Sequence, residues 1–288
     1  MEEQTKRIDL HIHTTASDGT ATPEEVVRAA ADMGLGAIAI TDHDTAAGYA
    51  RAAAEGRRLG LEVVPGIEIS TKYGRAVHIL GYYIDPEAPA LREVLDWIVR
   101  DRDERNAKMC QLMRDDGIDI TYDYMRERFG EVIGRPHFAE ILIERGLARD
   151  MNDAFDRYVE KGRKYYQGRN FLSIERSIEI IRAAGGTAVI AHPFQYRFDD
   201  AGLRDLIEHC MASGLEGMEC RYSGYDAAMS LYLEALAEEY GLLKTGGSDF
   251  HGGNKPHICL GTGIRGELDV PYEWLERLRE EAEKLHKK

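Results

Sequence analysis

Histidines and carboxylates recur in short motifs along this chain. His11 and His13 stand two residues apart, and because side chains alternate along an extended strand, both imidazoles are expected on the same face. Two imidazoles on one face can bind a single metal ion, and Asp18 is near enough in sequence to turn back toward them. Considered alone, the pair could also be two half-buried histidines without a metal.

Other motifs place similar side chains after, or within, short apolar runs. Glu68 lies between two isoleucines, where burying a carboxylate is costly unless it is paired or binds a cation. A salt bridge to a buried arginine is the alternative for this glutamate. The remaining candidates are Asp42, His43, His78, His192, Asp249 and His251. Any one of these histidines could be a hydrogen-bonded core residue, but together they predict one metal-binding cluster at the rim of a barrel.

The elements that would position these residues alternate between strand and helix. Strands are predicted by six apolar runs, at residues 8–12, 37–40, 63–69, 77–81, 188–191 and 215–220. Thr22, Pro23 and Glu25 have the spacing of a helix start with a capping box. Strand followed by helix favours an α/β fold with a parallel sheet, and ligands at strand ends favour a barrel over an open sheet.

The middle of the chain departs from this alternation. Residues 100–169 contain as many basic as acidic residues, so the rest of the chain carries the whole net charge of -14. Helix-like pieces follow one another up to about Tyr166, and no strand of comparable quality interrupts them. We therefore expect a discontinuous barrel of residues 1–98 and 170–288, with residues 99–169 forming a mostly helical inserted domain that caps one face.

Composition excludes several classes of protein. The apolar fraction of 43% supports a core, whereas no window approaches the roughly 18 apolar residues of a membrane span. The four cysteines are scattered without a CxxC pair, which argues against a zinc ribbon or a redox motif. The acidic net charge argues against duplex DNA as a partner. The first residues lack a signal-peptide pattern, so a cytoplasmic location with no membrane or obligate protein partner is expected.

Taken in order, the motifs resemble those of the polymerase and histidinol phosphatase (PHP) family. They are Asp-Leu-His-Ile-His from Asp9, Ile-Thr-Asp-His-Asp from Ile40, Pro-Gly-Ile-Glu from Pro65, His-Ile-Leu-Gly from His78, Ala-His-Pro from Ala191 and Ser-Asp-Phe-His from Ser248. The chain looks most like the stand-alone PHP phosphoesterases that carry a helical insertion. This resemblance implies a distorted (β/α)7 barrel that holds two to three divalent metal ions.

The resemblance also implies how nine ligands are divided among the metals. The first metal would be held by His11, His13, Glu68 and Asp249. Glu68 would bridge to a second metal, held also by His78 and His192. The third would be held by Asp18, His43 and His251, so that no ligand is missing. Asp42 is then expected to orient a ligating imidazole, a role that metal-binding histidines almost always need filled.

Mixed imidazole and carboxylate ligands suit manganese, iron or zinc better than calcium. Manganese is the first choice, with iron, zinc or magnesium as alternatives. Two metals about 3.5 to 4 Å apart can activate a bridging hydroxide and neutralise the phosphoryl oxygens in an in-line displacement. The expected chemistry is hydrolysis of a phosphomonoester, in which the nine ligands act through the metals.

Substrate selectivity is expected from the insertion. Arg135 and His137 lie in a motif that resembles one of the nucleotide-acting members of the family, in which an arginine grips substrate phosphate and the histidine faces the active site. An arginine fork can hold phosphate oxygens bidentately. Lys164 lies in a basic, aromatic run and is a further candidate for phosphate binding. The alternatives are an arginine that caps a helix above a packed histidine, and a solvated linker around Lys164.

The favoured activity is removal of the 3'-phosphate from nucleoside 3',5'-bisphosphates, such as conversion of pAp to AMP. The enzymatic alternatives are a 5'-3' exoribonuclease acting on short RNA and a histidinol-phosphate phosphatase. A non-catalytic metal-binding module is the alternative from another class, and a missing ligand would be its mark. The expected partner is therefore a small anionic nucleotide or a short oligoribonucleotide.

Overall fold

The computed structural model describes residues 6–130 and 132–286, except for the side chains of residues 285 and 286. The chain divides into two compact units. One contains the chain up to Glu93 and again from Phe171 onward, and the other runs from Val94 to Asn170. The second unit thus starts slightly before residue 99, where the inserted domain was expected to begin.

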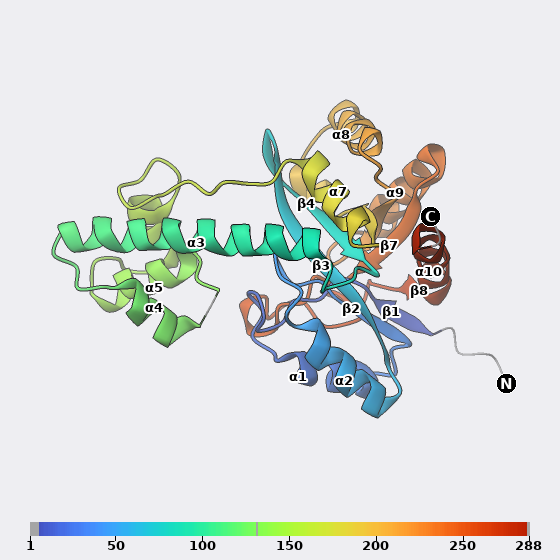
Figure 1. Ribbon diagram of the computed structural model, residues 1–288, viewed down its shortest axis with the longest axis horizontal. Helices are drawn as coiled ribbons and strands as arrows, with labels where there is room; N and C mark the ends of the chain where they lie inside the picture. The colour runs from blue at the N-terminus through green and yellow to red at the C-terminus, as the bar shows by residue number, and fades with distance from the viewer. Residues whose placement is uncertain (1–5, 131, 287–288) are drawn as a thin grey trace. The chain divides into compact units, whose positions relative to one another are not determined.

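An eight-stranded sheet forms the first unit (Figure 1). Its strands are β1 (Arg7–Asp9), β2 (Ala37–Ile40), β3 (Glu62–Tyr73), β4 (Arg75–Tyr82), β5 (Thr187–Ile190), β6 (Gly217–Tyr222), β7 (Leu243–Gly247) and β8 (Val270–Pro271). They lie in the order β7-β6-β5-β4-β3-β2-β1-β8. Past the end of β1, Leu10 N–H donates to Gly246 O at 3.1 Å and Ile12 bridges Phe250. These contacts nearly close the sheet into a barrel, which confirms the predicted α/β barrel class.

Strand direction differs from the prediction of a parallel sheet. β4 is antiparallel to both β3 and β5, and β8 is antiparallel to β1. The physical reason is the connection between β3 and β4, because a single residue, Gly74, separates them and a parallel pair needs a crossover of a dozen residues or more. Gly74 has a φ of 67°, which glycine adopts without strain.

Strand boundaries also differ from prediction, most clearly for β1, β6, β7 and β8. β1 ends at Asp9, and Leu10 to Ile12 continue outside the ladder apart from the bridge at Ile12. β6 is shifted by two residues relative to the predicted run at 215–220. β7 and β8 were not predicted, since β7 contains one lysine and two glycines and β8 has only two residues.

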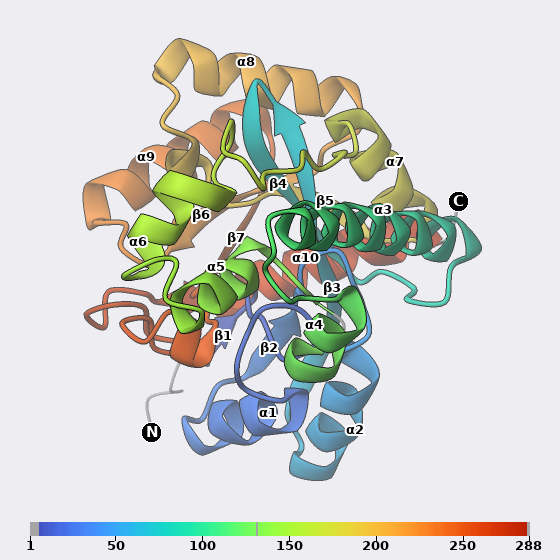
Figure 2. The ribbon, with the colours of Figure 1, turned by 90° about the vertical axis from the view of Figure 1, so that its left-hand side faces the viewer.

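The longer helices of the first unit pack against the sheet or against one another (Figure 2). They are α1 (Pro23–Asp32), α2 (Tyr49–Leu59), α7 (Ile174–Ala183), α8 (Asp200–Ala212), α9 (Ala227–Tyr240) and α10 (Tyr272–His286). α1 starts as predicted, because the Thr22 side chain accepts from Glu25 N–H and Thr22 N–H donates to Glu25 Oε2 at 2.8 Å. Val26, Val27 and Ile38 are among the buried side chains between α1, α2 and the sheet. Each such side chain contributes about 1.5–3 kcal/mol by leaving water, which fixes the strands that carry the site.

The second unit is helical. It contains most of α3 (Pro89–Asp115), then α4 (Tyr122–Phe129), α5 (Arg135–Glu144), α6 (Met151–Ala154) and a π-helical turn at Phe155–Val159. It has its own core, which includes Met109, Met113, Met125, Phe138 and Leu142. Within the described part of this unit no strand occurs, as the sequence predicted. Among the helices described in either unit, none is long and apolar enough to cross a membrane.

Candidate metal centre

All nine predicted ligands come together in the first unit. Their potential ligand atoms form four groups, within each of which the atoms lie no more than 4.8 Å apart. The groups are His13, Asp18, His43 and His251; His11, Glu68 and His192; His11, His13 and Asp249; and His43, Glu68 and His78. The ligands follow the carboxyl ends of β1, β2, β5 and β7, or stand on the β3–β4 hairpin, as the barrel prediction required for most of them.

Glu68 is at the centre of these groups and is fully buried. Its Oε1 lies 2.9 Å from His78 Nδ1 and 3.0 Å from His192 Nε2. Its Oε2 lies within 3.0 to 3.4 Å of three further imidazoles, those of His43, His13 and His11. Although burial alone would raise it, these imidazoles hold the pKa of Glu68 well below its usual range. The predicted alternative, a buried arginine paired with Glu68, is wrong, because its partners are imidazoles.

Asp249 presents its two oxygens to different partners. Oδ1 lies 3.3 Å from His13 Nε2 and 3.7 Å from His11 Nε2. Oδ2 accepts from Tyr222 OH at 2.6 Å and from Lys255 Nζ at 2.5 Å. Oδ2 is therefore held by the protein, and Oδ1 is the oxygen directed at the imidazoles.

Asp18 is the most exposed of the nine ligands. Its side chain is 48% exposed, and its Oδ1 lies 3.2 Å from His251 Nε2 and 3.7 Å from His13 Nδ1. His43 and His78 are also partly exposed, each with 23% of its side chain accessible. The cluster is therefore accessible at these three ligands and buried at the others.

Backbone strain marks two of the ligands themselves. His192 has a φ of 27° and Asp249 has a φ of 57°, in the region that L-residues rarely adopt. Each costs on the order of 1–3 kcal/mol and persists only when the surroundings hold it. His192 N–H donates to Glu219 Oε2 at 2.6 Å, and Asp249 N–H donates to His11 O at 2.8 Å. Strain held in this way is typical of functional sites.

The chemistry of this donor set fits metal ions. Six buried ligand atoms make no hydrogen bond: Nε2 of His11, both ring nitrogens of His13, Nδ1 of His43, Oε2 of Glu68 and Nδ1 of His192. Burying polar atoms without partners is costly, and a divalent cation between imidazole nitrogens and carboxylate oxygens removes that cost. With no thiolate among the nine ligands, the site is unlike a thiolate-closed structural zinc site.

The grouping of ligands is not identical to the one that the resemblance implies. His192 is in the same group as His11 and Glu68, whereas His78 is in the same group as His43 and Glu68. The implied second metal would instead take His78 and His192 together, both of which contact the same Oε1 of Glu68. Glu68 is shared between groups in either arrangement, which suits a bridging carboxylate.

Asp42 differs from its expected role. It is fully buried, and its carboxylate accepts from Thr14 N–H at 2.7 Å, from Thr14 OH at 2.9 Å and from Ser17 OH at 2.6 Å. The expectation that Asp42 orients an imidazole is therefore corrected, because hydrogen bonds to the loop after β1 occupy both of its oxygens. Asp42 fixes the segment that carries Asp18.

One carboxylate that contacts a ligating imidazole, at the ring nitrogen turned away from the ligand group, was not predicted from the sequence. Glu219, on β6, is fully buried and its Oε1 lies 3.0 Å from His11 Nδ1. The signal was available, since Glu219 stands between Met218 and Cys220 in a predicted strand, much as Glu68 stands between isoleucines. Asp9 was also missed as a structural link, because it accepts from Ser248 N–H and Gly261 N–H, each at 2.8 Å.

The proposed substrate contacts lie in the second unit. His137 Nδ1 accepts from Gly134 N–H at 3.0 Å, so the histidine caps the start of α5. Arg135 donates to Glu160 at 2.9 Å and keeps 35% of its side chain exposed. Lys164 pairs with Asp116 and is 62% exposed. The histidine, rather than the arginine, thus caps the helix.

Arg135 is one of several arginines that lie near Arg105. Arg105, on α3, donates to Ile133 O at 3.3 Å, immediately before the turn that carries Arg135. Burial, followed by the positive charges of Arg169, Arg102 and Arg135, lowers the pKa of Arg105 to about 10. A planar arginine fork can hold phosphate oxygens bidentately, so these arginines are the candidates for that role within the second unit.

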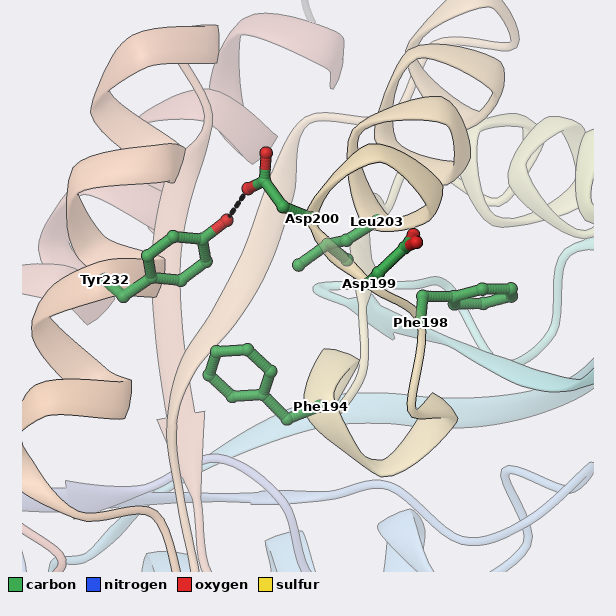
Figure 3. A pocket seen from close by; sticks show the side chains of 6 residues that line it. All are labelled: Phe194, Phe198, Asp199, Asp200, Leu203 and Tyr232. Carbon is green, nitrogen blue, oxygen red and sulfur yellow. Dashed lines mark hydrogen bonds between the residues drawn. The ribbon is translucent and has the colours of Figure 1, made fainter.

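A pocket of about 250 Å³ lies elsewhere on the first unit (Figure 3). It is lined by Phe194, Phe198, Leu203 and Tyr232, with Asp199 and Asp200 at its edge. Tyr232 OH donates to Asp200, and Asp199 accepts from Gly202 N–H at 2.9 Å. Both acids are engaged within the protein and none of the nine ligands lines this pocket, so the metal centre is the candidate active site.

An α/β barrel that gathers buried His, Asp and Glu ligands is typical of metal-dependent hydrolases. The chain belongs to the PHP family, whose domain model, described as PHP domain, matches residues 9–287. It is accordingly a metal-dependent hydrolase of phosphoester bonds, as predicted.

Known relatives agree with this assignment. The chain is 38% identical over 248 residues to the 3',5'-nucleoside bisphosphate phosphatase of Chromobacterium violaceum, covering 85% of this chain and 87% of the relative. It is 37% identical over 247 residues to the 5'-3' exoribonuclease Rnm of Escherichia coli, covering 84% of each. Among solved structures, a metal-dependent phosphoesterase from Bifidobacterium adolescentis is 31% identical with a TM-score of 0.80, over 97% of this chain and 98% of that chain.

Proposed function

We propose that the chain hydrolyses the 3'-phosphate of nucleoside 3',5'-bisphosphates such as pAp and leaves the 5'-monophosphate. The observation that carries this proposal is the nine-ligand cluster, whose imidazole and carboxylate donors suit metal ions that act on a phosphate. The second phosphate of such a substrate is assigned to Arg135 because the resemblance implies that role. The relative from Chromobacterium violaceum, named for this activity, supports the choice.

We propose manganese as the bound metal, in two to three sites, with the nine ligands divided as the resemblance implies. Imidazole nitrogen and carboxylate oxygen are donors that manganese accepts. When bound, such ions supply a nucleophile at neutral pH and neutralise charge on the phosphoryl oxygens.

The residues of the chain have separable tasks in this account. Glu68 and Asp249 hold the buried imidazoles in place, and Asp18 is the ligand most accessible to an arriving substrate. Lys255, which contacts Asp249 Oδ2 and is 35% exposed, adds a positive charge beside the cluster. Arg135 holds the phosphate that is not hydrolysed, through its fork of donors. Lys164 and His137 support that grip.

A 5'-3' exoribonuclease is the second candidate, because relatives from Escherichia coli and Haemophilus influenzae carry that name. The two reactions share their chemistry. Each breaks the bond between phosphorus and the 3'-oxygen of a 5'-phosphorylated nucleotide. They differ only in whether the 3'-phosphate carries a further nucleotide, so room beyond that phosphate decides between them.

A rate comparison tests the proposal. Protein reconstituted with manganese is given pAp, a short 5'-phosphorylated RNA and histidinol phosphate, and initial rates are compared at matched concentrations. Asp249→Asn is the inactive control. We expect pAp to be hydrolysed fastest; a preference for the RNA would support the second candidate, and no turnover of any substrate would contradict both.

A further inference from the structure

Glu219 connects two of the ligand segments. Its Oε1 lies 3.0 Å from His11 Nδ1, which follows β1, and its Oε2 accepts from the backbone N–H of His192, which follows β5, at 2.6 Å. Glu219 stands between them on β6 and is fully buried. One carboxylate therefore contacts two of the nine ligands without belonging to any ligand group.

The contact with His11 decides which ring nitrogen carries the proton. An ionised carboxylate only accepts hydrogen bonds, so His11 Nδ1 must donate to it. In the neutral imidazole Nε2 then keeps its lone pair. His11 Nε2 is buried, makes no hydrogen bond, and lies 3.4 Å from Glu68 Oε2 and 3.7 Å from Asp249 Oδ1. When His11 is neutral, as a metal ligand must be, the lone pair of Nε2 is thus on the side of the carboxylates of the proposed metal centre.

The contact with His192 acts on the backbone. His192 has a φ of 27°, which is unfavourable for an L-residue and has to be held by neighbouring groups. The short hydrogen bond from the His192 N–H to Glu219 stabilises this backbone conformation. It fixes the segment from which His192 Nε2 reaches Glu68 Oε1 at 3.0 Å.

We propose that Glu219 is a positioning residue, which fixes His11 in its metal-binding tautomer and holds His192 in its ligating conformation. To perform both tasks, the side chain must accept a hydrogen bond with each of its two carboxylate oxygens. A glutamine has one oxygen and one NH₂ group, so it can serve His11 or His192 but not both. Replacing one carboxylate oxygen by NH₂ either reverses the His11 tautomer or places two donors against each other at His192.

Glu216, the residue immediately before β6, provides a matched control. Its Oε2 accepts from Ala188 N–H at 3.0 Å, so it too holds a backbone N–H of β5 from the side of β6. Its other oxygen pairs with Arg182 instead of an imidazole. Glu219→Gln and Glu216→Gln are therefore the same chemical change at two positions, of which only the first contacts metal ligands.

The test is the affinity of the full chain for Mn²⁺, measured by titration after chelator treatment, for wild type and both variants. Loss of a group that orients a ligating histidine typically weakens metal binding about 10–100-fold, and we expect that range for Glu219→Gln. Glu216→Gln should stay within about twofold of wild type. Equal affinities for the two variants, or a Glu219→Gln value within about twofold of wild type, would overturn the proposal.

Nitrogen-detected NMR of the Zn²⁺-loaded wild type gives a second measurement, which decides the matter even where Glu219→Gln does not fold. A His11 ring proton on Nδ1 is expected, and a proton on Nε2 would overturn the proposal. Neither measurement uses a phosphorylated substrate. A failure of the proposed bisphosphatase activity therefore leaves this inference intact, and its own failure would appear in metal binding.

Discussion

Glu68 Oε1 lies 3.0 Å from His192 Nε2, although 124 residues separate the two along the chain. The other oxygen of the same carboxylate lies 3.0 Å from His43 Nδ1. Segments that follow β2 and β5 therefore meet at one side chain on β3. A carboxylate with this many imidazole neighbours is where loss of a single charge should affect the whole centre.

Glu68→Gln should abolish metal binding and lower kcat/KM by at least about a hundredfold, since the bridging charge is lost. Glu62→Gln is the control on the same strand, because Glu62 pairs with Arg279 rather than with any ligand. Metal content by elemental analysis and initial rates provide the measurements. If Glu68→Gln retains wild-type metal content, Glu68 is not a ligand.

Metal affinity should rise with pH between about 6.5 and 9. Although burial lowers it, the carboxylates of Glu68 and Asp18 raise the pKa of His43 to about 9, so this imidazole holds a proton at pH 7 in the metal-free protein. A metal must displace that proton. Burial, by contrast, lowers the pKa of His78 and His251, which are already neutral.

The stability of the metal-free protein should change in the opposite direction. A raised pKa in the folded state gives stability that is present below about pH 6.5 and lost as the pH rises through 9.

The metal prediction is measured by calorimetric titration with Mn²⁺ in buffers of different ionisation enthalpy, which counts the protons that the protein releases when the metal binds. A metal affinity that is constant from pH 6.5 to 9 would contradict the charge state assigned to His43.

Arg135→Ala should raise KM for pAp by about tenfold or more, because a charge-assisted contact to the second phosphate is lost. Arg149→Ala is the matched control, since Arg149 is 84% exposed and pairs with Asp153 in the same unit. We expect the control to keep the wild-type KM. An equal effect of both substitutions would mean that general charge, not a phosphate contact, is responsible.

One thiol of the folded protein should react with an alkylating reagent at pH 8. Cys259 is exposed, whereas Cys110, Cys210 and Cys220 are buried. Burial raises the pKa of the Cys110 thiol to about 11 and that of Cys210 to about 12, which removes the reactive thiolate. Mass spectrometry should show one label on the native protein and four after denaturation. Several labels on the native protein would show that Cys110, Cys210 or Cys220 is accessible to the reagent, in contradiction to the burial described.

Sequence patterns predicted the ligands well because a polar residue in an apolar run is informative by itself. Glu68 and His192 were identified in this way, and the structure brings them together. Glu219 also lies in an apolar run, but it was not predicted to belong to the site. The role of Glu219 depends on its contact with His11, which is 208 residues away, and spacing along the chain does not reveal such a pair.

Strand direction and the last strands were harder to predict, for a physical reason. Apolar runs show where strands lie but not which way they point, so the antiparallel β4 was missed. β7 lacks an apolar run partly because Gly247 faces the backbone of His11, and a Cβ there would lie 2.3 Å from His11 N. The close approach that builds the site removes the pattern that would have revealed the strand.

The most direct test of the account is the identity of the product formed from pAp by the manganese-loaded protein. ³¹P NMR distinguishes a remaining 5'-phosphate from a remaining 3'-phosphate and counts the inorganic phosphate released. We predict one equivalent of phosphate and AMP that keeps its 5'-phosphate, with neither formed by Glu68→Gln. Adenosine 3'-monophosphate as the product, or no release from pAp under conditions where short RNA is degraded, would contradict the proposed function.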